Sequence, residues 1–139
     1  MQCLDKDIVV IIKSNEMKNL IAFFEIPATD FKRAVDFYET VLDVTLSSCE
    51  WEEEKMAFFV EQGETVGSIS YTSYMSDFRP SSHGVLIHFS CNNLKETLQK
   101  VVAKGGKIVI PITKIQADNK GYFAVFADTE GNHIGLYTD

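Results

Sequence analysis

One pattern of elements occurs twice in this sequence. A short apolar segment, a helix start and an amphipathic helix fill residues 19–44, and the same succession returns in residues 85–105. Asp30 in the first copy and Asn93 in the second stand where a helix N-cap belongs. Both side chains can accept hydrogen bonds from the free amides of a first helical turn. Further strand-like segments follow each copy, so the chain is predicted to fold as two tandem modules.

Apolar residues recur at helical spacing after each cap. The first stripe consists of Phe31, Ala34, Val35, Tyr38, Val41 and Leu42, and the second of Leu94, Thr97, Leu98, Val101 and Val102. Charged residues lie between these positions, as in a helix with one face against a core. Asp43 and Gly105 follow the two stripes, and both tolerate the left-handed conformation that often ends a helix.

The repeat predicts an α+β fold in which two βαβββ modules form a curled mixed sheet with an open cleft. Module 1 is assigned to residues 19–75 and module 2 to residues 84–139, within a single domain. Residues 1–18 lie outside the repeat and are predicted to be an N-terminal extension, either an added edge strand or a poorly ordered leader. In module 2, Pro111 is expected to stop a strand and begin a loop, because proline donates nothing to a sheet ladder.

Charge and cysteine content narrow the partners and the location. Thirteen basic against twenty acidic residues give a net charge of −7, which argues against nucleic acid or an anionic membrane surface as a partner. The three cysteines form no CxxC or Cys/His cluster, so neither a disulfide framework nor a structural zinc site is indicated. The apolar run 8–12 is too short to span a membrane and lacks a signal-peptide cleavage site. A cytoplasmic location is therefore expected.

Three segments carry a resemblance to a known family. They read FEIPATDFKRAVDFYETVLD, NNLKETLQKVVAKGGKIVIP and FADTEGNHIGLY, in this order. With them the chain resembles the vicinal oxygen chelate superfamily, the group of glyoxalases, bleomycin-resistance proteins and extradiol dioxygenases. DTEGNHIGL is similar to that family's closing D-P-x-G-N-x-x-E-L pattern. The resemblance implies a homodimer that shares sheet edges, and a symmetric homodimer is also the commonest assembly.

The resemblance also implies a place for a divalent metal ion, but its ligands are missing. In metal-dependent relatives, a His or Glu of the first strand and a Glu of the last strand of each module bind the ion. The corresponding positions here are Phe23, Ser70, Leu86 and Gly135. None of them has a carboxylate or an imidazole, which divalent ions need. No metal ion and no other cofactor is therefore expected at these positions.

Glu25 and His88 are the candidate catalytic residues. Each lies two positions after a first-strand metal position, so both are expected to face the cleft. They are equivalent in the repeat, and pseudo-twofold symmetry would bring them close together. A Glu–His pair can move protons near neutral pH, although the two can equally orient a ligand or only satisfy each other. His133 is expected on the same face, and the three side chains would form an alternative set of metal donors.

The predicted ligand-binding residues are apolar, neutral or weakly basic. They are Phe23, Phe59, Ser70, Leu86, Phe123 and His133. Such a lining suits a flat or apolar small molecule with few polar anchors. The first hypothesis is therefore a glyoxalase/bleomycin-resistance-like protein that binds a small apolar or aromatic molecule without metal. The alternatives are a glyoxalase-type lyase or isomerase that uses Glu25 and His88, and a structural dimer module without a ligand.

Overall fold

The computed structural model describes residues 19–117 and 121–139. In chain order, its elements are β1 (Phe24–Pro27), α2 (Phe31–Leu42), β2 (Ser47–Glu50), β3 (Glu54–Glu61), β4 (Glu64–Thr72), β5 (His88–Ser90), α3 (Leu94–Ala103), β6 (Lys107–Lys114), β7 (Tyr122–Ala127) and β8 (His133–Thr138). Each half of the described chain thus contains a strand, a helix and three strands, which confirms the predicted α+β fold of two tandem βαβββ modules. The predicted N-terminal extension lies outside the described residues.

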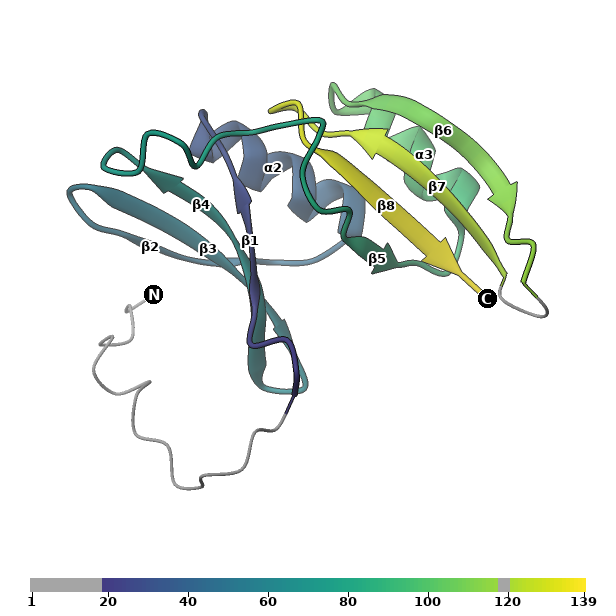
Figure 1. Cartoon of the computed structure of the whole chain (residues 1–139), viewed down its shortest axis with the longest axis horizontal. Helices are drawn as coiled ribbons and strands as arrows, with labels where there is room; N and C mark the ends of the chain where they lie inside the picture. The colour runs from purple at the N-terminus through teal and green to yellow at the C-terminus, as the bar shows by residue number, and fades with distance from the viewer. Residues whose placement is uncertain (1–18, 118–120) are drawn as a thin grey trace.

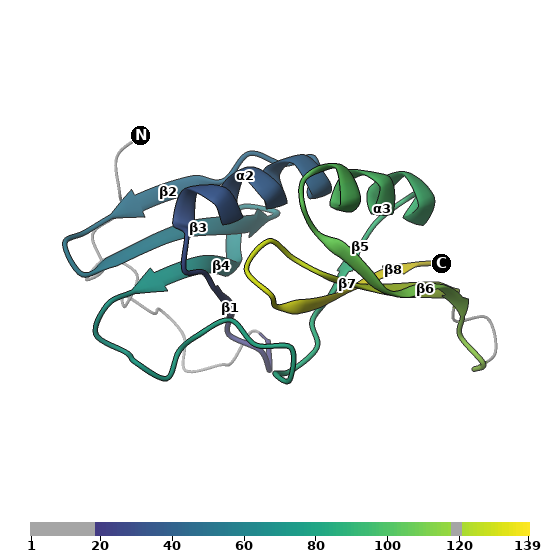
Figure 2. The ribbon, with the colours of Figure 1, turned by 90° about the horizontal axis from the view of Figure 1, so that it is seen from above.

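The strands form two four-stranded mixed sheets rather than one. Their orders are β1-β4-β3-β2 and β5-β8-β7-β6. In each sheet the first strand runs parallel to the last, and the other neighbours are antiparallel. Figure 1 shows the two sheets side by side, and Figure 2 shows α2 and α3 together on one side of them. Among residues 19–117 and 121–139, no helix lies on the opposite side of the sheets.

Both helices begin and end at the predicted residues. Asp30 Oδ1 accepts a hydrogen bond of 3.1 Å from the Arg33 amide, and the Asn93 side chain accepts one from the amide three residues on. Asp43 and Gly105 adopt left-handed backbone conformations with φ of 55° and 99°. The local signals in the sequence therefore set the helix boundaries.

The prediction that Pro111 ends a strand and begins a loop is wrong. β6 continues across Pro111 to Lys114, and its register against β7 shifts between Ile108 and Ile110 and again between Ile110 and Thr113. β6 lies at the edge of its sheet, where a missing amide costs no ladder hydrogen bond. Whether a proline ends a strand thus depends on whether that strand lies at the edge or in the middle of the sheet.

The two modules share one hydrophobic core. Phe37 of α2 is 1 % exposed, and its ring centroid lies 5.8 Å from that of Phe126 in β7. The neighbouring Tyr38 ring contacts Phe89 of β5 at 6.1 Å. A single cluster of buried side chains therefore extends from α2 across both sheets and includes residues of α3.

The helix stripes predicted from the spacing need two corrections. The predicted stripe omits Phe37, which is among the largest fully buried side chains. The predicted stripe includes Val102, which is 54 % exposed. The helical period locates the inner face of a helix to within about one residue, and contacts with the neighbouring module determine which residues at its edges are buried.

Neither α2 nor α3 combines the length and apolar character needed to cross a bilayer.

Candidate functional site

The sheet side away from α2 and α3 is called the open face. In module 1, Ile26 of β1 and Ile69 of β4 belong to the core under the helices. Glu25, Ser68 and Ser70 alternate with them along the strands, so their side chains lie on the open face. The predicted orientation of Glu25 and Ser70 therefore agrees with the strand pattern.

The second module presents an equivalent set of side chains. Ala124, Phe126, Ile134 and Leu136 of β7 and β8 are core residues. The residues that alternate with them, Phe123, His133 and Gly135, lie on the open face. His88 of β5 joins them, because the adjacent Phe89 packs against the core.

A chain of hydrogen bonds connects Glu25 to two buried serines. Ser70 Oγ donates to Glu25 Oε1 at 2.8 Å, and Ser68 Oγ lies 2.8 Å from Ser70 Oγ. The serines are 3 % and 0 % exposed, respectively, whereas Glu25 is exposed. Met56 and Phe58 of β3 lie opposite Ser70 and Ser68 in the ladder and therefore flank them on the same face.

His88 covers Gly135 in the second module. The two residues are partners in the β5–β8 ladder, and a Cβ added at Gly135 would lie 2.2 Å from His88 Nδ1. The imidazole also meets the Phe123 ring edge to face at a centroid distance of 6.3 Å. The two modules therefore share one arrangement. Glu25 contacts Ser70, and His88 lies over Gly135. In each pair, a residue of the first strand covers the last-strand position that corresponds to a metal ligand in metal-dependent relatives.

Glu25 and His88 belong to different sheets. Within residues 19–117 and 121–139, no hydrogen bond or ion pair joins these two side chains. The described residues also contain no group of three or more His, Cys, Asp or Glu side chains that could hold a metal ion. One chain thus does not assemble the alternative donor set of Glu25, His88 and His133, nor the proton-transfer pair expected from symmetry.

Three other predicted site residues lie in different surroundings. Phe59 is buried on the helix side, where its ring packs against Phe24, Tyr38 and Phe89. It belongs to the core and not to the open face, because the core position Ala57 precedes it by one full strand period. Phe23 and Leu86 are exposed and lie just before β1 and β5.

A hollow on the helix side was not predicted. Its volume is about 700 Å³, and it lies between the first turns of α2 and the outer ends of β2, β3 and β4. Phe31, Val35 and Tyr71 line it, with the Lys55 ammonium 5.7 Å from the Tyr71 ring centroid. This hollow is separated from the open face by the first sheet, so it is not part of the predicted cleft.

The turn between β7 and β8 holds a buried carboxylate that the sequence reading missed. Glu130 Oε1 accepts hydrogen bonds from the amides of Thr29 and Asp30 at 2.9 and 2.8 Å and from the Thr29 hydroxyl at 3.0 Å. Its Oε2 accepts from Arg33 Nε at 2.7 Å and from the Thr129 hydroxyl at 3.0 Å. Burial by itself would raise the pKa of Glu130, but these donors together lower it to about 2.

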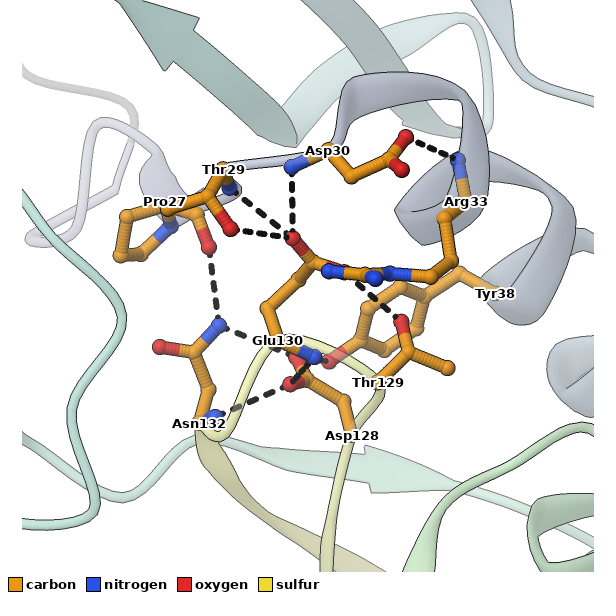
Figure 3. A network of polar contacts seen from close by, with 9 residues as sticks. All are labelled: Pro27, Thr29, Asp30, Arg33, Tyr38, Asp128, Thr129, Glu130 and Asn132. Atoms are coloured by element: carbon orange, nitrogen blue, oxygen red, sulfur yellow. Dashed lines mark hydrogen bonds and ion pairs between the residues drawn. The ribbon is translucent and has the colours of Figure 1, made fainter.

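Asp128 and Asn132 of the same turn extend the hydrogen bonds of Glu130. We call this set of contacts between the β7–β8 turn and the β1–α2 turn the junction network, and Figure 3 shows it. Asp128 accepts a 2.6 Å hydrogen bond from the Tyr38 hydroxyl, and burial together with the Asp128 charge raises the pKa of Tyr38. Asn132 Nδ2 donates to Asp128 and to the Pro27 carbonyl, and its Oδ1 accepts from the Ser81 amide. The junction network therefore ties module 2 to the β1–α2 turn of module 1. Its sequence signal was the polar run DTEGN.

The paired βαβββ modules define a protein of the glyoxalase-fold class. Residues 20–136 match the family model described as Glyoxalase/Bleomycin resistance protein/Dioxygenase superfamily. The chain belongs to this superfamily, which confirms the resemblance found in its sequence.

Solved structures with the same fold are distant in sequence. A glyoxalase/bleomycin resistance protein from Albidiferax ferrireducens has 16 % identity and a TM-score of 0.65, over 87 % of this chain and 99 % of that one. Glyoxalase I from Zea mays has 17 % identity and a TM-score of 0.63, over 82 % of this chain and 44 % of the maize chain. This chain thus spans less than half the length of the maize enzyme. No curated protein sequence matches it.

Proposed function

We propose that the protein binds a small, mainly apolar or aromatic molecule on the open face, without a metal ion. The observation that carries this proposal is the chain from Ser68 through Ser70 to Glu25, flanked by Met56 and Phe58. The two buried serines hold the exposed Glu25 carboxylate in one orientation beside apolar side chains, and a small number of fixed polar groups among apolar ones is typical of small-molecule sites. The four positions that hold the ion in metal-dependent relatives offer only apolar, hydroxyl or glycine groups here.

The geometry favours binding over the lyase or isomerase alternative. Proton transfer by Glu25 and His88 requires both groups to reach one substrate atom. Glu25 instead accepts from Ser70, and His88 lies against Gly135 and Phe123 on the other sheet. Each group is therefore better placed to orient a ligand than to share a proton with the other.

A second copy of the chain is proposed to close the open face. The segments that lead into β1 and β5 expose large apolar side chains, with Leu20 84 % and Val85 90 % exposed. Ile21, Phe23 and Leu86 add to this apolar surface, which a symmetric homodimer would cover. Sedimentation velocity is expected to give a dimer, and Val85→Lys combined with Leu20→Lys a folded monomer. A wild-type monomer at micromolar concentration would contradict the proposed dimer.

A cytoplasmic location remains a prediction.

A thermal-shift screen tests the proposed binding. Purified protein is mixed with a panel of small aromatic and apolar metabolites, with EDTA or with added zinc, nickel or manganese. The expected result is a rise in Tm that persists in EDTA, because a ligand that binds only the folded state stabilises it by mass action. Phe58→Ala is expected to reduce the shift, whereas Val102→Ala, a truncation on the exposed side of α3, leaves it unchanged. Shifts that appear only with an added metal would overturn the proposal.

A further inference from the structure

The hydroxyl protons of Ser68 and Ser70 are both committed within the protein. A serine hydroxyl has one proton to donate. Ser70 donates its proton to Glu25 Oε1. The contact between Ser68 Oγ and Ser70 Oγ therefore requires Ser68 to be the donor. No hydroxyl proton of this chain of hydrogen bonds is left for a ligand.

The polar end of the site consequently offers only acceptors. Glu25 is exposed, and its Oε2 accepts no hydrogen bond from the described residues. None of the ion pairs between described residues includes Glu25. A carboxylate that has a fixed donor on one oxygen and a free second oxygen is complementary to a donor, and charge-assisted hydrogen bonds are the strongest of this kind.

We infer that the molecule bound on the open face carries a protonated nitrogen, an ammonium or amidinium group, that donates to Glu25. This inference rests on the proposed function and adds the charge of the ligand to it. Phe58 and Met56 lie opposite the serines in the β3–β4 ladder and suit the apolar body of such a cation. The face of an aromatic ring such as that of Phe58 also attracts a cation. The net charge of −7 favours the approach of cations over anions.

Three probes with one aromatic body test the charge. They are 1-naphthylmethylammonium, 1-naphthylmethanol and 1-naphthoate, titrated into the ¹⁵N-labelled full chain and followed through the amide signals of β1 and β4. The ammonium is expected to bind about tenfold more tightly than the alcohol, with the carboxylate weakest. Raising the salt concentration from about 20 to 300 mM is expected to weaken the ammonium and not the alcohol.

Variants test whether Glu25 causes the preference for the ammonium probe. Glu25→Gln is expected to bring the ammonium and the alcohol to within about twofold of each other. Glu52→Gln, which removes the same charge from the exposed β2–β3 turn, retains the tenfold difference. Ser70→Ala also retains it, because the carboxylate remains. Thermal unfolding of each variant confirms that it is folded.

The outcomes separate this inference from the proposed function. Equal affinities of the wild type for the ammonium and the alcohol, or tighter binding of the naphthoate, would overturn the inference and leave the proposed function standing. A preference for the ammonium that survives Glu25→Gln would overturn it as well. Failure of all three probes to bind, together with a metabolite panel that gives no shift, would overturn both.

Discussion

Replacing Phe37 with alanine is expected to lower the free energy of unfolding by about 4 kcal/mol. The side chain is 1 % exposed and packs against Phe126, which belongs to the other module. A Cβ added at Gly106 would also lie 3.0 Å from Phe37 Cε1, so the ring fills its space closely. The cavity left by the truncation would lie between the modules, where neither can collapse into it alone.

Urea unfolding followed by two probes measures this effect. Trp51 fluorescence reports on module 1, and amide signals of β7 and β8 report on module 2. Both are expected to shift to the same lower midpoint, because one core holds both modules together. Val102→Ala is the matched control on α3, with an expected change within about 0.5 kcal/mol. Separate midpoints for the two probes in the wild type would show that the modules unfold independently.

Glu130→Ala is expected to cost about 3 kcal/mol at pH 7, since it leaves buried donors without an acceptor. The lost partners include the amides of Thr29 and Asp30 at the start of α2. The side chain of Glu130 is 0 % exposed, so water does not replace it without rearrangement. These amides belong to the N-cap and the residue before it, so removing their acceptor and its negative charge also weakens the N-terminus of α2.

The effect of Glu130 is expected to depend on pH in a defined direction. Its pKa is about 2 in the folded protein and about 4.5 in the unfolded chain. A depressed folded-state pKa contributes stability that is fully present above about pH 4.5 and is lost as the pH falls toward 2. Stability curves of the wild type and Glu130→Ala are thus expected to converge between pH 4.5 and 2. Glu61→Ala, at an exposed position of β3, is the control, and parallel curves for wild type and Glu130→Ala would contradict the assignment.

The sequence predicted those features that depend on neighbours along the chain. Asp30, Asn93, Asp43 and Gly105 act through backbone groups within one turn, so their roles could be read locally. The tandem repeat then gave the fold, because two equivalent amphipathic units have to bury their helix faces together. The prediction for Pro111 is wrong because the effect of a proline depends on whether its strand lies at an edge, as β6 does.

Features that depend on contact between modules could not be predicted. Phe37 and Phe59 were placed wrongly or overlooked because the partner rings come from distant segments. The role of Glu130 requires its turn to meet the start of α2, about a hundred residues earlier. For the site, strand alternation indicated which side chains share a face. It could not indicate that Glu25 would be held by Ser70 in one sheet and His88 by Gly135 in the other.

The imidazole above Gly135 occupies the space that a carboxylate at this position would need. Any side chain at position 135 starts with a Cβ only 2.2 Å from His88 Nδ1, so even alanine would displace the ring. A glutamate introduced there would have to push the exposed His88 ring aside. Phe23, Ser70 and Leu86 would have to change as well before an ion could be held, so a ligand that needs no ion suits the present residues better.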